Sequence, residues 1–357
     1  MMNITIGLDV GDRWSQVCAV DADGAVVQEG RIPTTRAALR ARFPGTTACR
    51  VVVEAGTHAG WISRELAAQG HEVLVANSRK LRWLYHNEHK TDRVDATYLA
   101  RVGRWDPTLL APIRVRSAGA DGALRLVRAR ASLVRARTRL INHVRGAVKS
   151  VGCQLPPCDA TSFARRVAAH LPAELHAALE PLLAQIAGLT QTIAGYDRLV
   201  EHLAAQVYPH TARLRQVAGV GALTALAFVL TVDDPRRFGD GRAVGAYFGL
   251  CPRRADSGAH RPQLGITKCG DGLVRQLLVQ AAHYILGPFG PDCRLRRWGL
   301  ELARRGGKNA KKRAIIAVAR KLAALLYSLW VHDTRYTPLP AAPERPNDPD
   351  PPVSVTA

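Results

Sequence analysis

The stretch ITIGLDVGDRWSQVCAVDADGAVVQEGRI, residues 4–32, sets the fold expected for the amino-terminal part of the chain. Its apolar residues indicate short strands over residues 4–10, 16–21 and 25–32. The sequence DADG at 21–24 is typical of a hairpin turn between the last two of these strands. The chain is therefore predicted to open with consecutive antiparallel strands.

An alternation of strand and helix follows this opening. The segments RVVVE at 50–54 and EVLVA at 72–76 read as short apolar strands, and helical patterns occupy 59–69 and 91–102. Antiparallel strands followed by alternating strand and helix are the order expected of an RNase H-like α/β domain. We place this domain at residues 1–112.

The middle of the chain, residues 113–210, is predicted to be a basic helical domain. No acidic residue occurs between Asp121 and Asp159, and one long helix is expected there. Two adjacent seven-residue rows supply its apolar seam: Leu126, Leu133, Leu140 and Ala147, and Val127, Val134, Ile141 and Val148. The remaining faces are left free for phosphates, and the nucleic-acid contacts assigned to them are Arg125, Arg128, Arg135 and Arg139.

A second helical segment, from Leu175 to Val207, repeats apolar residues at spacings of four and three. This is the pattern of a coiled-coil seam. Pro181 lies inside it, so the helix is either kinked or begins at that residue. The two segments can pack as a hairpin within one chain or mediate dimerisation, and the sequence does not distinguish these alternatives.

The last third, residues 211–335, mixes short helical patterns with glycine-rich turns. Between Arg294 and Lys321 there are eleven lysines and arginines and one acidic residue, Glu301. The proline-rich residues 336–357 are expected to form a disordered tail. The nucleic-acid contacts assigned to this part of the chain are Arg253, Arg254, Arg261, Lys268, Lys308, Lys311, Lys312 and Arg313.

The composition points to a polyanionic partner. The 357 residues include 50 lysines and arginines but 29 acidic residues, a net charge of +21. Solubility needs far less imbalance, so nucleic acid is the favoured partner. The seven cysteines form no CxxC pair, so neither a zinc site nor a disulfide framework follows. Without a leader or an apolar run of about 18 residues, a cytoplasmic protein with no membrane segment is expected.

Four carboxylates are candidates for a metal site. Asp9 ends the strand in IGLDVG and Glu54 ends the strand in RVVVEAG, while Asp92 and Asp95 share a helix face in KTDRVDATYLA. Mg²⁺ and Mn²⁺ prefer oxygen ligands, and two such ions about 4 Å apart stabilise the attacking and leaving oxygens of phosphoryl transfer. Taken singly, each residue also fits a turn or, for Asp92, a helix cap. The set, in a basic chain, favours a metal site.

The motifs GLDVG, VVVEAG and KTDRVDATYLA resemble the DEDD signature of insertion-sequence transposases with a RuvC-like domain. Two later stretches, QVAGVGALTALAFVLTVDDPRRF and AYFGLCPRRADSGAHRPQLGITKCGDGLVRQLLVQAAH, are similar to the C-terminal signature of the same family. The resemblance covers nearly the whole chain. It implies an α/β plus α architecture with a RuvC-like RNase H domain, a central coiled-coil hairpin and a mostly helical C-terminal transposase domain.

In members of this family that act as RNA-guided recombinases, a serine attacks the DNA phosphate, and the resemblance places this role on Ser257 in RADSG. A hydroxyl needs a base, a metal or a cationic pocket to act as a nucleophile. Outside the family context, Ser-Gly in a loop indicates only a turn. Asp256 stands where a small or neutral polar residue is expected, and its charge either hinders the phosphate or serves as the base. The neighbours able to steady the phosphate are Arg253, Arg254, His260, Arg261 and Lys268.

The resemblance implies a transposase that excises and inserts its own element, with Mg²⁺ or Mn²⁺ on Asp9, Glu54, Asp92 and Asp95. It further implies donor and target DNA, a structured non-coding guide RNA, and a homo-oligomer (dimer or tetramer) in which one subunit's carboxylates serve another's serine. One alternative is a metal-dependent junction-cleaving or exonuclease-like hydrolase that uses water. A second is a non-enzymatic nucleic-acid-packaging protein. The absence of Asp-x-Glu on the first strand argues against an exonuclease with four carboxylates.

Tryptophans offer a further, weaker signal. They can stack on unpaired bases, but scattered single tryptophans are more often core residues. The six in this chain are Trp14, Trp61, Trp83, Trp105, Trp298 and Trp330.

Overall fold

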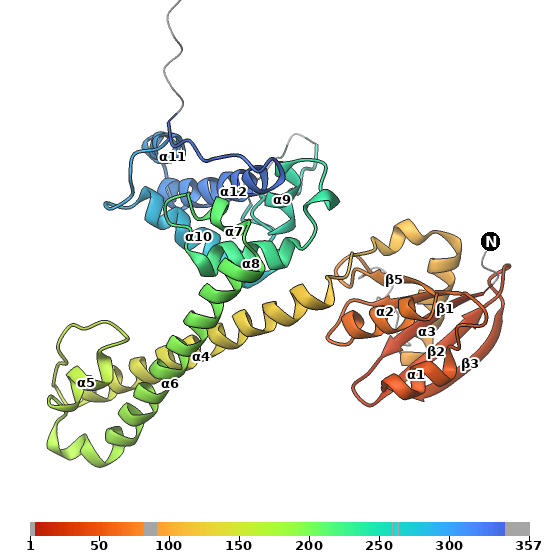
Figure 1. Ribbon diagram of the computed structural model, residues 1–357, viewed down its shortest axis with the longest axis horizontal. Coiled ribbons are helices and arrows are strands. Elements are labelled where there is room, and N and C mark those ends of the chain that lie inside the picture. Colours follow the sequence, from red (N-terminus) through yellow and green to blue (C-terminus); the bar gives the residue numbers. More distant parts are fainter. Residues whose placement is uncertain (1–3, 82–90, 259, 261, 263, 340–357) are drawn as a thin grey trace, which may run out of the picture. The chain divides into compact units, whose positions relative to one another are not determined.

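The computed structural model describes residues 4–81, 91–258, 260, 262 and 264–339 (Figure 1). By its internal contacts the chain divides into two compact units, residues 1–117 and 118–357. We call them unit 1 and unit 2. Unit 2 contains most of the expected central helical domain, 113–210, together with the expected C-terminal domain, 211–335. A domain boundary at residue 210 stays a prediction.

Unit 1 is built on a five-stranded mixed sheet with the strand order β3-β2-β1-β4-β5. Strands β1 (Thr5–Val10), β2 (Trp14–Val20) and β3 (Val26–Pro33) are antiparallel to their neighbours. Strands β4 (Arg50–Glu54) and β5 (Glu72–Ala76) continue the sheet in parallel with β1. The predicted strands are therefore confirmed, and their arrangement is consistent with an RNase H-like domain.

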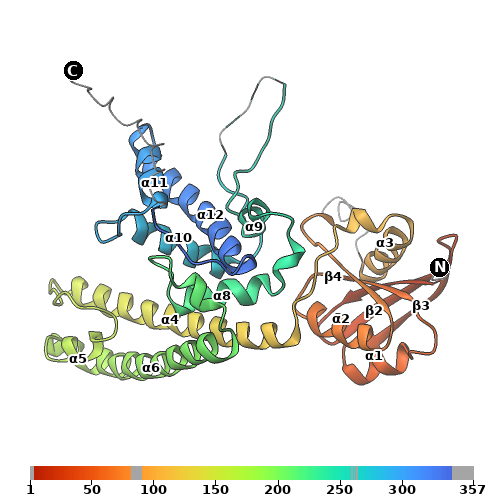
Figure 2. The same cartoon turned by 45° about the horizontal axis from the view of Figure 1, so that its top comes forward.

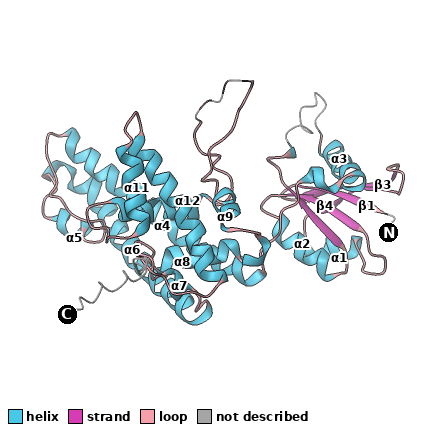
Figure 3. Cartoon of the chain, turned by 90° about the horizontal axis from the view of Figure 1, so that it is seen from above, coloured by secondary structure: helices cyan, strands magenta, loops and turns pink. Residues whose placement is uncertain are grey.

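Helices cover both faces of this sheet (Figure 3). Helices α1 (Arg36–Arg42) and α2 (Ala59–Ala68) lie on one face, where Leu8 of β1 packs in one core with Ile62 of α2. Helix α3 (Asp92–Trp105) covers the other face and is followed by a 3₁₀ turn at Pro107–Leu110. Helix α1 is an addition to the elements expected from the sequence.

A glycine allows α3 to lie directly on β1. A Cβ atom on Gly7 would stand 1.9 Å from the backbone oxygen of Ala96 and 2.6 Å from the backbone nitrogen of Ala100. Near the other end of the helix, a Cβ on Gly103 would lie 2.3 Å from Cγ2 of Val52. Backbone atoms cannot rotate aside as the end of a side chain can. The helix therefore depends on glycine at position 7 for its distance from the sheet.

Unit 2 begins with two long helices that form an antiparallel hairpin, α4 (Ala118–Ser150) and α6 (His176–His202) (Figure 2). A short helix, α5 (Phe163–Ala168), packs beside the far end of the hairpin in a shared core with both helices. Two side-chain contacts join the helices: Arg130 forms an ion pair with Asp197, and Arg137 donates a hydrogen bond to Thr190. The later residue of α4 contacts the earlier residue of α6, so the two helices are antiparallel.

The apolar rows predicted on these helices are buried in part, since the row from Leu126 to Ala147 is only half-buried. Val127, Ile141 and Val148 of α4 are buried. Helix α6 begins at His176, before Pro181, so the alternative that it begins at the proline is wrong. A π-helical turn, Leu203–Val207, ends this segment. The hairpin within one chain is thus observed, and dimerisation through it stays a prediction.

The remaining helices of unit 2 surround α8, which is apolar on every side and almost wholly buried, as a central helix must be. Among the described helices, α12 is long and apolar enough to cross a membrane by length and composition. It packs instead against α9, α10 and α11 in the core of this unit. The bounds are α7 (Thr211–Leu214), α8 (Ala222–Val232), α9 (Gly241–Tyr247), α10 (Gly272–Leu286), α11 (Arg294–Arg304) and α12 (Ala310–Val331).

The start of the expected disordered tail is attached to unit 2. The backbone N–H of Tyr336 donates to Oε1 of Gln216 at 2.8 Å, and the carbonyl of Pro338 accepts from the N–H of Arg294 at 2.9 Å. Residues 340–357 of that tail lie outside the described residues.

Replacing Gly7 with alanine should destabilise unit 1 by about 1–3 kcal/mol, because the added methyl meets backbone atoms of α3 that cannot move aside independently. Gly30→Ala in β3 is the matched control, since a Cβ there has nothing within 4 Å. Urea denaturation followed by circular dichroism measures both free energies of unfolding. Equal stability of the two variants would contradict the role given to Gly7.

Candidate active site

Two of the predicted carboxylates lie side by side at the ends of neighbouring parallel strands. Leu8 of β1 and Val53 of β4 are register partners, and Asp9 and Glu54 follow them directly. Partnered residues of parallel strands point to the same face, and successive residues alternate between faces. Since Leu8 packs toward α2, Asp9 and Glu54 belong to the face that α3 covers. Both are half-buried.

The other two carboxylates come from the first turn of α3. Gly103 lies over the start of β1 and β4, and Ala96 lies over Gly7 in the middle of β1, so the helix runs opposite to β1. Its first turn therefore reaches the end of β1 where Asp9 stands. Asp95 is buried at 8% exposure, whereas Asp92 is exposed.

The cap of α3 is Thr91, whose hydroxyl accepts a hydrogen bond from the N–H of Val94 at 3.3 Å. The alternative that Asp92 serves as the cap is wrong. Both aspartates lie in the first turn of the helix, where the helix N-terminus favours negative charge.

All four predicted residues are placed at one end and on one face of the sheet, and all four supply carboxylate oxygens. That donor set suits a hard divalent cation. Within the described ranges, however, no three histidine, cysteine, aspartate or glutamate side chains are gathered closely enough to hold a metal ion. The four residues thus share one end of the sheet, and the metal site predicted from the sequence stays a prediction.

Contacts between the loops at this end were not expected from the sequence. Oδ1 of Asp12, after β1, lies 3.5 Å from Nε2 of His58, after β4. In the loop after β5, the hydroxyl of Ser78 donates to the carbonyl of Ala55 at 2.8 Å. These contacts join the loops that follow β1, β4 and β5. Their local signals, a lone histidine and a lone serine, are too common to be recognised in a sequence.

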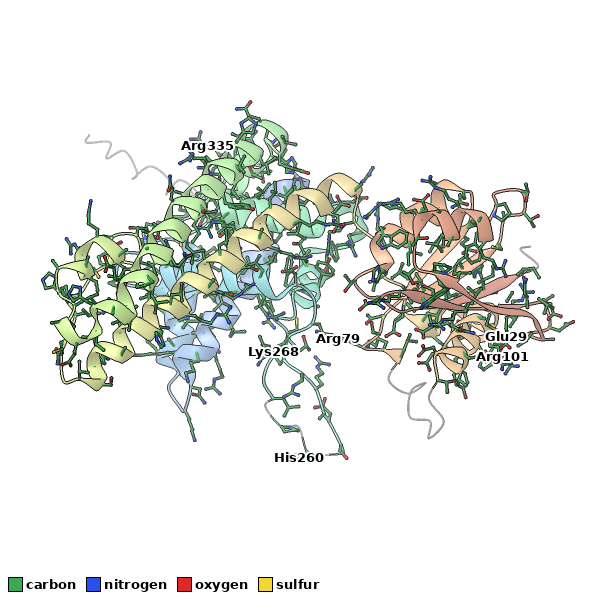
Figure 4. All side chains as sticks on the ribbon, turned by 90° about the horizontal axis from the view of Figure 1, so that it is seen from below. Glu29, Arg79, Arg101, His260, Lys268 and Arg335 are labelled. Atoms are coloured by element: carbon green, nitrogen blue, oxygen red, sulfur yellow. The ribbon has the colours of Figure 1, made fainter. Side chains whose placement is uncertain are left out.

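Ser257 belongs to unit 2 and lies at the tip of a long loop that extends from the helices of this unit (Figure 2). Backbone hydrogen bonds join the two arms of the loop. Near the middle, the N–H of Arg253 donates to the carbonyl of Gly265 at 2.9 Å. At the tip, Ser257 and His260 each donate an N–H to the carbonyl of the other, at 3.1 and 2.9 Å. Gly258, between the last two, has a left-handed φ of 55°. Figure 4 shows His260 at the tip and Lys268 at the base. The side chain of Ser257 is exposed.

The base of the loop is closed by two glycines that sequence reasoning did not single out. A Cβ on Gly249 would stand 2.3 Å from the backbone nitrogen of Cys269, and one on Gly270 would stand 2.0 Å from the oxygen of Tyr247. Both glycines have a left-handed φ of 67°. The tip therefore projects from a tightly packed base. The two glycines could have been noticed as possible turn residues in the sequences FGLC and KCGDG.

Asp271 fixes the first turn of α10, directly after this loop. Its carboxylate accepts from the N–H groups of Leu273 and Val274 at 2.9 and 3.1 Å and pairs with Arg128 at 2.7 Å. Burial alone would raise the pKa of this carboxyl, but these hydrogen bonds hold the pKa below its ordinary value. Arg128, predicted to contact nucleic acid, thus also links α4 to α10.

The other predicted cations differ in how far they are engaged within the chain. On α4, Arg125 pairs with Asp121 at 3.0 Å and Arg135 donates to Ser132 at 2.8 Å. Arg137, on a face expected to be free for phosphates, is buried at 8% exposure, and that expectation is wrong for it. Arg261 lies outside the described residues. Every cation predicted to contact nucleic acid is exposed within the described residues, including those paired within the chain: Arg125, Arg128, Arg135, Arg139, Arg253, Arg254, Lys268, Lys308, Lys311, Lys312 and Arg313.

Comparison with known proteins agrees with both parts of this arrangement. Residues 6–152 match a transposase family of the DEDD type, and residues 211–294 match the family described as "Transposase IS116/IS110/IS902 family". All four carboxylates lie in the first match and Ser257 in the second.

Relatives with similarity along the whole chain agree as well. A "Probable family 20 transposase" of Pseudomonas aeruginosa is 30% identical, over 94% of this chain and 100% of the relative. The "Transposase for insertion sequence element IS1111A" of Coxiella burnetii is 26% identical over 93% and 90%. That for IS1328 of Yersinia enterocolitica is 27% identical over 94% and 99%. The chain therefore belongs to the IS116/IS110/IS902 family of DEDD insertion-sequence transposases.

Proposed function

We propose that this protein is a site-specific DNA recombinase that excises and inserts its own element. The observation that carries the proposal is the placement of four carboxylates at one end and one face of an RNase H-like sheet. The named relatives, which match almost the whole chain, support it. The net charge of +21 supplies the attraction to DNA. The protein would work in the cytoplasm, bound to the DNA of the nucleoid.

Asp9, Glu54, Asp92 and Asp95 would hold Mg²⁺ or Mn²⁺ between them. When bound, a divalent cation polarises the scissile phosphate and neutralises charge that develops on its oxygens. Binding of such an ion would draw the four carboxylate side chains together. The closeness of α3 to β1 keeps the first turn of the helix within reach of Asp9.

Ser257 would act as the nucleophile. Its Oγ forms a bond to phosphorus while its proton passes to an acceptor, for which Asp256 is the adjacent candidate. The bond from phosphorus to a deoxyribose oxygen breaks, and that oxygen leaves as a hydroxyl. A hydroxyl of the partner strand then attacks the phosphoserine and releases the serine. Arg253, Arg254 and Lys268 belong to the same loop, and their positive charge would favour the pentacovalent phosphate.

Sequence choice would come from a structured non-coding RNA that pairs with donor and target DNA, as base pairing does in other guided systems. The exposed cations predicted from the sequence to contact nucleic acid, such as Arg139 and Lys311, would hold the backbones of these nucleic acids. The protein would work as a dimer or tetramer, in which one subunit's carboxylates serve the serine of another.

Metal uptake separates the recombinase from a packaging protein. Isothermal titration with Mn²⁺ should show binding to the wild-type protein, and Asp9→Asn and Glu54→Gln should each weaken it about tenfold or more, because each removes an oxygen donor. Asp23→Asn, an exposed carboxylate at the opposite end of the sheet, should change nothing. Absence of uptake, or uptake untouched by both variants, would favour the packaging protein.

A covalent adduct separates the serine recombinase from a hydrolase. Incubated with nicked donor DNA, the wild-type protein should form a protein–DNA adduct that survives denaturing electrophoresis. Ser257→Ala should form none, while Ser150→Ala, an exposed serine at the end of α4, should match the wild type. Cleavage that continues in Ser257→Ala without an adduct would point to water as the nucleophile.

Guidance by RNA predicts a defined companion transcript. The protein purified from its host should carry RNA transcribed from the flank of its own element, which sequencing of the co-purified RNA will reveal. Random cellular RNA in that fraction would contradict guidance but leave the adduct chemistry intact.

A further inference from the structure

A cavity of about 790 Å³ opens in unit 1 at the end of the sheet opposite Asp9 and Glu54. Its walls include Thr5 and Arg50, the first residues of β1 and β4. The last turn of α3 contributes Arg101, Arg104 and Trp105. Figure 4 shows Arg101 on this edge of the unit. We call this cavity the Trp105 pocket, and the candidate active site does not use it.

Two of its guanidinium groups are held in position by the fold. Arg50 donates from Nη1 to the carbonyl of Gly103 at 3.0 Å and from Nε to Glu72 at 2.8 Å. Arg104 donates from Nε to the carbonyl of Ala22 at 3.1 Å. Their planar forks are therefore fixed before any ligand arrives, which reduces the entropy lost on binding. Arg101 is exposed, and the acidic groups of the lining, Glu72 and Asp23, leave an excess of positive charge.

Trp105 is 84% exposed, although a core position is the usual place for an isolated tryptophan. A tryptophan that anchors a protein partner is commonly surrounded by groups that exclude water. Here the neighbouring walls carry guanidinium, carboxylate and hydroxyl groups. An exposed aromatic face beside fixed cations instead matches the pattern of a single-strand binding site, where a base stacks and phosphates meet arginines.

We propose that the Trp105 pocket binds an unpaired nucleotide of a single-stranded nucleic acid. The base stacks on Trp105, and the flanking phosphates lie against Arg101 and Arg104. The site holds a strand on the RNase H-like unit at the end of the sheet away from the carboxylates, so that a strand bound there is positioned and not cut. This contact is separate from the chemistry of Ser257 and does not require it.

The test measures binding of short fluorescein-labelled oligomers, uridine RNA and thymidine DNA, to the full chain by fluorescence anisotropy over a range of salt concentrations. Trp105→Ala should weaken binding of the preferred oligomer about tenfold, with an unchanged salt dependence, because it removes stacking and no charge. Trp105→Phe keeps an aromatic face and should stay within about threefold of the wild type. Comparison of the two oligomers identifies the sugar of the natural ligand.

Arg101→Gln should lower the slope of log affinity against log salt by about one, since one phosphate contact is lost. Arg335→Gln, an exposed arginine of unit 2, removes the same charge and should alter neither slope nor affinity. Photo-crosslinking with a 4-thiouridine oligomer should label the peptide that contains Trp105.

Wild-type affinity in Trp105→Ala, or equal losses in Arg101→Gln and Arg335→Gln, would overturn the proposal, as would crosslinks confined to other peptides. A change in sedimentation of Trp105→Ala without loss of oligomer affinity would also overturn it, in favour of a contact between protein chains. Adduct formation by these variants is measured separately, so failure of this proposal leaves that of the recombinase standing.

Discussion

The distance between α3 and β1 is the constraint on which the candidate active site depends. At Gly7 the two backbones are close enough that a methyl group would meet the carbonyl of Ala96. Because a helix is rigid over its length, this single contact also fixes where its first turn lies. Asp92 and Asp95 reach the end of the sheet that carries Asp9 and Glu54 for this reason. The same helix places Trp105 at the opposite end, so one packing contact positions two separate surfaces.

Electrostatic repulsion among four nearby carboxylates opposes their gathering when no cation is present. The helix N-terminus partly offsets it, because the partial positive charge of the first turn of α3 acts on Asp92 and Asp95.

Unit 2 uses its positive charge in two ways. Some arginines of α4 hold the unit together, as Arg128 does with Asp271 and Arg137 does with Thr190. Others, such as Arg139 and the lysines before and within the first turn of α12, are exposed to solvent. The loop of Ser257 likewise has one part that is fixed and one part that is exposed. Close backbone packing at Gly249 and Gly270 fixes its base, whereas Ser257 at its tip is exposed, as are Arg253 and Arg254 in the same loop.

The sequence by itself determined the order of strands and helices in unit 1 apart from α1, the family, and the end of the sheet at which the carboxylates emerge. These follow from local periodicity and from short motifs, which any segment carries within itself. Only the tertiary structure decided which cations are engaged within the chain, that α6 continues through Pro181, that Thr91 and not Asp92 caps α3, and that Trp105 faces solvent. Each of these depends on a partner distant in sequence or on the packing of a whole element. A pattern of neighbouring residues holds no information about which remote group arrives beside it.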